Sequence, residues 1–111
     1  MRHFERNSQM TKHIIWSPSA ENDFLLILEY LQYNWDEKVS HRFIEITDKL
    51  IMQISINPTQ FPVIQNDKKI RKCVISKHNT LYYRERRAYI DVLRIFDKRQ
   101  DPRKFSFYYH K

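Results

Sequence analysis

Residues 13–24 read HIIWSPSAENDF and contain the change of pattern on which the fold depends. The first four residues include two β-branched isoleucines and favour a short strand. Ser17 and Pro18 then stop the strand, because serine is a good helix N-cap and proline suits the first helical position. Glu21 and Asp23 follow in the first turn, where the helix dipole favours negative charge. The stretch predicts a strand that leads directly into a helix.

Two helices are expected in the first half of the chain. Apolar residues recur at helical spacing on both sides of the interruption QYNWD, where Asp36 is a plausible second N-cap. They are Ala20, Phe24, Ile27, Leu28 and Leu31 before it, and Val39, Phe43, Ile46, Leu50 and Ile54 after it. Asn57 and Pro58 end the second helix. Helices of roughly 16 and 20 residues with so short a link form an antiparallel hairpin.

The period changes from helical to alternating after a proline-marked connector over residues 58–67. Three strands are expected, at residues 69–76, 80–85 and 89–97, joined by short turns as an antiparallel meander. The third is apolar on both faces, as a central strand would be. The sequence thus predicts an α+β fold in the order β-α-α-β-β-β, with the helical hairpin on one face of an antiparallel sheet.

Composition narrows the classes of protein. The 111 residues suit one domain, expected over residues 12–111, after a polar lead-in at residues 1–11 in which Met1 and Met10 are both possible starts. One cysteine, no long apolar run and no secretory signal predict a cytoplasmic protein without a membrane segment. The absence of glycine excludes phosphate-cradling glycine loops and leaves positive-φ turns to Asn, Asp or His. No paired CxxC or HxxxH ligands occur, so neither a metal nor a cofactor is expected.

Charge is segregated along the chain. Residues 1–65 carry a balance of −2 and residues 66–111 a balance of +9. Solubility alone is one explanation, but a basic half also suits a polyanion or an acidic protein partner. The candidate binding residues are Arg71, Lys72, Arg84, Arg86, Arg87, Arg94, Lys98 and Arg99, which with Tyr82 and Tyr83 are expected to form a cationic sheet face.

Three features together resemble the RelE/ParE superfamily of bacterial toxins. The first is the short strand before Ser17, Pro18 and Ala20, with Asp23 three residues further on. The second is a helical hairpin with the aromatic residues Tyr33 and Trp35 at its link. The third is the end of the last strand at residues 99–102, RQDP, a sequence common at this place in ParE-like members. The resemblance covers roughly residues 12–104, and it implies the toxin half of a type II toxin–antitoxin module with a cognate antitoxin as partner.

The resemblance leaves two activities open. RelE-like members are similar to metal-independent ribonucleases that cut messenger RNA on the ribosome, whereas ParE-like members act on DNA gyrase. The RelE pattern matches Arg71 and Arg99, but Cys73 and Thr80 stand where cations are expected and Phe105 replaces the acid–base tyrosine. If the chain is a nuclease, the catalytic candidates are Arg71, Arg99, Tyr109 and His110, with Tyr108 a further substitute.

The resemblance is therefore closer to ParE. It implies a toxin that inhibits gyrase by direct binding without catalysing a reaction, with the RelE-type endoribonuclease as the alternative. A plain RNA-binding module is a third possibility that the paired helices disfavour.

Several single residues carry separate expectations. Arg99 is expected to pair with Asp97 or Asp101, rather than to bind an anion. Arg94 is expected to point to the open sheet face or to meet Glu85 or Asp91. The remaining three expectations concern aromatic and cysteine side chains: Tyr33 and Trp35 cap the core at the helix link, one of Tyr82 and Tyr83 lies in the core, and Cys73 is a small buried side chain, not a nucleophile.

Overall fold

A computed structural model describes residues 11–99, which form two helices and five strands. In chain order the elements are β1 (His13–Trp16), α1 (Pro18–Asn34), α2 (Glu37–Ile56), β2 (Val63–Gln65), β3 (Ile70–Val74), β4 (Asn79–Glu85) and β5 (Tyr89–Asp97). The predicted order of two helices between a first strand and a meander is confirmed.

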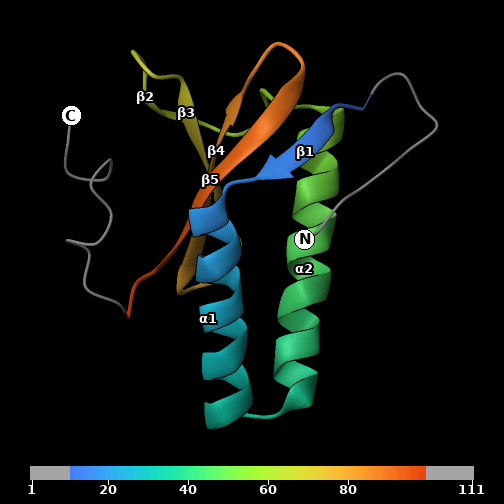
Figure 1. The fold of residues 1–111 in the computed structure, drawn as a ribbon, viewed down its shortest axis with the longest axis vertical. Coiled ribbons are helices and arrows are strands. Elements are labelled where there is room, and N and C mark those ends of the chain that lie inside the picture. The colour runs from blue at the N-terminus through green and yellow to red at the C-terminus, as the bar shows by residue number, and fades with distance from the viewer. Residues whose placement is uncertain (1–10, 100–111) are drawn as a thin grey trace.

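The strands form one mixed sheet in the order β1-β5-β4-β3-β2. β1 runs parallel to β5, and the other neighbours are antiparallel. β5 is therefore flanked by strands on both sides, as its apolar sequence predicts. The helices lie side by side against one face of this sheet, and their link extends well beyond its edge (Figure 1).

The junction between β1 and α1 is fixed by Ser17. Its Oγ accepts a hydrogen bond from the Ala20 N–H at 3.0 Å and donates one to the Leu93 carbonyl at 2.9 Å. Its backbone N–H donates to the Val92 carbonyl at 2.9 Å. One serine therefore caps the helix and also extends the β1–β5 pairing at the point where the strand passes into the helix.

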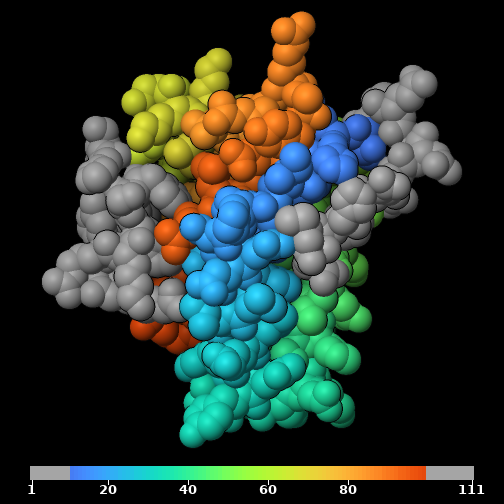
Figure 2. Space-filling view, viewed as in Figure 1, coloured from blue at the N-terminus to red at the C-terminus, as the bar shows by residue number. Residues whose placement is uncertain are grey.

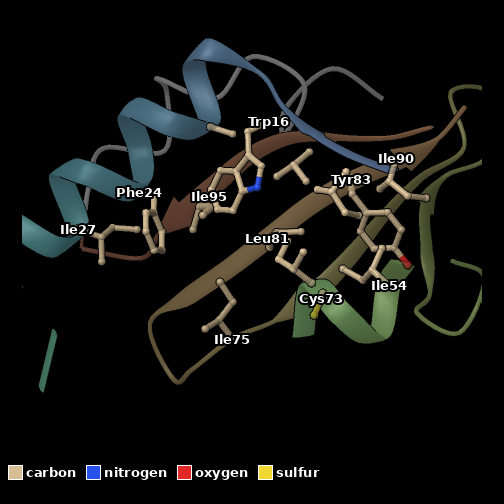
Figure 3. Close-up of a cluster of buried hydrophobic side chains, with 14 of the residues drawn as sticks. Trp16, Phe24, Ile27, Ile54, Cys73, Ile75, Leu81, Tyr83, Ile90 and Ile95 are labelled. Carbon is tan, nitrogen blue, oxygen red and sulfur yellow. The ribbon is translucent and has the colours of Figure 1, made fainter. Parts of the chain in front are cut away.

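The core lies between the hairpin and the sheet. Phe24 links the layers, because its ring meets Trp16 edge-on at a centroid distance of 5.2 Å and stacks on Phe43 at 5.7 Å. Leu81 and Tyr83 of β4 and Ile95 of β5 complete the fully buried centre (Figure 3). The Tyr83 hydroxyl donates to the Pro58 carbonyl at 2.7 Å, which satisfies its polar end.

A bulge in β5 changes which side chains face the core. Tyr82 is opposite Arg94, but Tyr83 is opposite Val92, so Leu93 is the extra residue. Strict alternation along a strand would place Leu93 and Ile95 on the same face, and the bulge separates them. Ile95 packs in the main core, whereas Leu93 packs with a second cluster on the face away from the helices, which is here called the outer face. That cluster comprises Ile70, Tyr82 and Phe96.

The connector of residues 58–67 contains a strand that was not predicted. β2 pairs with β3 at the sheet edge, and its three residues are too few for an alternating pattern to be visible in the sequence. The Arg71 Nη1 holds the preceding segment by donating to the Thr59 carbonyl at 3.2 Å and the Phe61 carbonyl at 2.7 Å. The edge strand is therefore positioned by a side chain of its neighbour.

The turn before β3 uses an unexpected residue. Lys69, with φ of 56°, is the one residue in a left-handed conformation within residues 11–99. Asn, Asp or His was expected there, and for this turn the prediction is wrong. A side chain with a Cβ atom costs roughly 1–2 kcal/mol in this conformation, so the chain retains lysine at an energetic disadvantage.

Candidate partner-binding surfaces

The eight predicted binding residues do not form one continuous face. Neighbouring residues of a strand point to opposite faces, so Arg71 and Lys72 diverge. The outer face carries Lys72, Arg84 and Arg94; the sheet end near the β4–β5 turn carries Arg71, Arg86 and Arg87; and the opposite end carries Lys98 and Arg99. The cations therefore form three groups with different surroundings.

The outer face contains a cavity of about 470 Å³. Its cationic lining is Lys68, Arg84 and Arg94, and its other lining residues are Ser17, Ser19, Ile70 and Leu93. The Nε atom of Arg84 is buried and has no hydrogen-bond partner within the described part of the chain. An unpaired buried donor is costly, so Arg84 contributes to this cavity a guanidinium whose hydrogen bonds are incomplete within residues 11–99.

Arg94 is held at the rim of this cavity by α1. Its Nε and Nη2 donate to the two carboxylate oxygens of Asp23 at 2.7 and 2.9 Å. The same carboxylate accepts the backbone N–H of Ile95 at 2.9 Å. Asp23 thus accepts the next backbone N–H of the β5 edge after β1 has ended. Of the two alternatives predicted for Arg94, the structure shows the open face; its ion pair is with Asp23, and not with Glu85 or Asp91 as the other alternative had it.

Arg99 is bound within the chain. Its Nε and Nη2 donate to the Asp97 carboxylate at 2.9 and 3.0 Å, and its guanidinium lies 4.2 Å from the ring centroid of Tyr30. The bond to Asp97 raises the pKa of the Arg99 guanidinium above its usual value. The expected pairing of Arg99 with Asp97 is therefore present, and this charge is largely compensated.

The cysteine of the chain is not placed for nucleophilic attack. Cys73 is fully buried, as expected, and burial raises the pKa of its thiol to about 11. Such a thiol is protonated at neutral pH and is a poor nucleophile. Among residues 11–99, no group of three histidine, cysteine, aspartate or glutamate side chains is placed to hold a metal ion. Phe105, Tyr108, Tyr109 and His110 lie outside the described residues.

The hairpin carries an apolar surface that sequence reasoning placed in the core. Tyr33 is 88% exposed and Trp35 is 66% exposed, so the prediction that they cap the core is wrong. The reason is tertiary, because the helix link extends past the sheet and nothing in the described chain covers it (Figure 1). Leu26, Tyr30 and Tyr33 follow one another at spacings of four and three residues and form an exposed apolar stripe along α1.

The sequence does contain a pattern that indicates this exposed stripe. The run FLLILEYL, at residues 24–31, is apolar around most of the helix, and only one side of it is needed for the core. The candidate binding residues predicted from the sequence also omitted Lys12 and Lys69, which lie beside Arg71, Arg86 and Arg87 in the structure. Each lies just before a strand, where no local pattern distinguishes a binding residue from a solvated one.

Comparison with known proteins identifies the family of this chain. The family model described as the ParE toxin of type II toxin–antitoxin system, parDE, matches residues 14–102. The chain belongs to the ParE toxin family. No curated protein sequence is a significant match to this toxin.

Solved structures support the fold of the ParE-family toxin. The chromosomal ParDE system from P. aeruginosa contains a chain with a TM-score of 0.67 at 14% identity, over 81% of this chain and 98% of that one. A YoeB/ParE toxin from Agrobacterium tumefaciens has a TM-score of 0.55 at 16% identity, over 76% and 95% of the two chains. Within residues 11–99, neither helix of the toxin combines the length and apolar character needed to cross a bilayer.

Proposed function

We propose that this ParE-family toxin inhibits DNA gyrase by direct binding, acts in the cytoplasm and catalyses no reaction itself. The observation that carries the proposal is the ParE family match over residues 14–102. Gyrase is the target that the resemblance to ParE-like members implies.

The contacts of the candidate nuclease residues support binding over catalysis. Metal-independent RNA cleavage needs a base, an acid and cations directed at the phosphate. Arg71 donates to the carbonyls of the β2 connector, and Arg99 forms a bidentate pair with Asp97. The Arg99 guanidinium is therefore committed to Asp97, and Arg71 is anchored through one of its nitrogens. Arg84 at the outer-face cavity, by contrast, has a donor without a partner among residues 11–99.

Charge reversal at Arg84 is expected to weaken gyrase inhibition. The purified full chain should block supercoiling of relaxed plasmid by gyrase, and Arg84→Glu should raise the concentration for half-inhibition at least tenfold, or about 1.4 kcal/mol or more. Lys49→Glu is the matched control, since Lys49 is exposed on α2 and remote in sequence from the cavity residues. It should change the half-inhibitory concentration less than twofold.

Two results would reject the gyrase proposal. One is normal supercoiling at any toxin concentration together with ribosome-dependent cleavage of messenger RNA, which would favour the RelE-type alternative. In that case, changing Arg71, Arg99 and His110 together should abolish toxicity without unfolding the chain. The other is tight, salt-sensitive binding to duplex RNA with no growth arrest, which would favour an RNA-binding module.

Membership of a toxin–antitoxin family implies an antitoxin partner. We propose that the antitoxin neutralises this toxin by laying an amphipathic helix along the stripe of Leu26, Tyr30 and Tyr33. Helix-in-groove recognition uses apolar anchors at spacings of three and four residues, which the stripe presents. The edge strand β2 offers a further place, where an antitoxin segment could add a strand to the sheet.

Leu26→Glu is expected to uncouple the toxin from its antitoxin. Placing a charge in an apolar contact should weaken binding of the antitoxin encoded beside the toxin at least tenfold, measured by calorimetry, while growth arrest by the toxin alone persists. Ile56→Glu is the control, because Ile56 is 49% exposed and Leu26 is 44% exposed. Equal affinity of the two variants for the antitoxin would contradict the assignment of this stripe.

A further inference from the structure

A second cavity lies at the end of the sheet, where β3 and β5 begin and β4 ends. It has a volume of about 280 Å³ and is lined by Lys12, Lys69, Arg71, Glu85, Arg86 and Arg87. The β2–β3 and β4–β5 turns both lie at this end (Figure 1), and side chains of the latter turn stand out from the molecule in orange (Figure 2). Residues far apart in the sequence thus bring five cations to one small hollow.

The charges of this cavity are poorly balanced. The one carboxylate in its lining, that of Glu85, forms an ion pair with Lys12, with 2.8 Å between Nζ and Oε2. Outside the lining, Asp91 makes a long contact of 3.9 Å with Arg86. Lys69 and Arg87 have no ion-pair partner among residues 11–99. Like charges held this close repel one another, so the cluster opposes folding unless an anion joins it.

The backbone and one side chain are already arranged for such an anion. Lys69 is the residue held in the left-handed conformation, which brings strain to the cavity wall. Arg71 has its Nη1 fixed on two backbone carbonyls, so its guanidinium is positioned before any ligand arrives. A fixed donor loses less conformational freedom on binding than a mobile one.

We propose that this cavity binds an oligophosphate, an anion of linked phosphate groups. A terminal phosphate group carries about −1.5 to −2 charges near neutral pH. Each further linked group adds another negative charge, so two or three linked groups suit a hollow with five cations and one carboxylate. Arginine forks bind phosphate oxygens in pairs, and lysines add compact charges around them. Inorganic polyphosphate and the phosphate tail of a nucleotide share this chemistry. The site is separate from the outer-face cavity and does not rest on the action of the toxin on gyrase.

The test is calorimetric titration of the purified full chain with tripolyphosphate, ATP and orthophosphate at one fixed ionic strength. Tripolyphosphate is expected to bind at least tenfold more tightly than orthophosphate. ATP that binds like tripolyphosphate would assign the site to nucleotides, and ATP that binds much more weakly would assign it to inorganic polyphosphate. Equal affinity for tripolyphosphate and orthophosphate, or binding of duplex DNA without tripolyphosphate, would overturn the proposal.

Paired charge reversals locate the site. Lys69→Glu with Arg87→Glu should weaken tripolyphosphate binding at least tenfold, whereas Lys38→Glu with Lys49→Glu on α2 makes the same change in net charge and should weaken it less than twofold. Equal losses in the two pairs would overturn the proposal, because they would reflect total charge alone. Lys69→Gly removes the cation and, because glycine has no Cβ atom, the strain of the left-handed conformation, without adding charge. It should raise the melting temperature while weakening binding, and unchanged binding would overturn the role of Lys69.

Discussion

Replacing Asp23 with alanine is expected to lower the free energy of unfolding by about 3–5 kcal/mol, the range for breaking a buried ion pair. The Asp23 carboxylate is 7% exposed and accepts two bonds from Arg94 and one from the Ile95 backbone. Its loss leaves a cation partly buried and an N–H of β5 without its acceptor. Urea unfolding followed by circular dichroism measures the effect.

Two further variants separate the contributions at Asp23. Glu29→Ala, at an exposed position of the same helix, should change the free energy of unfolding by less than about 0.5 kcal/mol. Asp23→Asn keeps an acceptor for Ile95 but removes the charge, and it should fall between the wild type and Asp23→Ala. A loss below about 1 kcal/mol for Asp23→Ala would contradict the role assigned to this ion pair.

Replacing Asp97 with alanine is expected to cost about 2–3 kcal/mol of stability. Asp97 is 5% exposed at its side chain and accepts from the backbone N–H, Nε and Nη2 of Arg99. A hydrogen bond to a charged group contributes about 1.5–3 kcal/mol, and bonds that share one carboxylate do not add independently. The Arg99 side chain is 29% exposed, so water can solvate its guanidinium once Asp97 is gone. This solvation reduces the loss in the free energy of unfolding.

The Asp97 variant also decides what Arg99 does. Asp67→Ala is the control, at an exposed turn position, and should leave the urea midpoint nearly unchanged. If Asp97→Ala proves as stable as the wild type, then the ion pair does not hold Arg99 in place. Arg99 would then return to the set of residues available for an external anion.

Local signals in the sequence determined the helices and the order of elements. Ser17 and Asp36 cap the two helices as predicted, with side chains that accept from Ala20 and Val39, and Asn57 ends the second helix. Each signal involves residues within one turn of one another. It therefore acts before any tertiary contact exists, and the sequence alone is sufficient to locate it.

The sites depended on contacts between residues far apart. The partner of Arg94 lies 71 positions earlier in the chain, and no spacing rule connects Asp23 to it. A single bulge at Leu93 moved side chains between faces, because the alternation of a strand reverses at every inserted residue.

Likewise, whether an apolar residue such as Tyr33 is buried depends on how far the sheet extends beneath the hairpin. The sequence by itself determined the two helices, the first strand, the three meander strands and the basic character of the second half of the chain, but not the edge strand β2. Only the tertiary structure decided which basic side chains lie close together and which of them have an acidic partner. The reason is that the sequence shows which residues are charged, whereas the interaction between two charges depends on the distance between them in the folded chain.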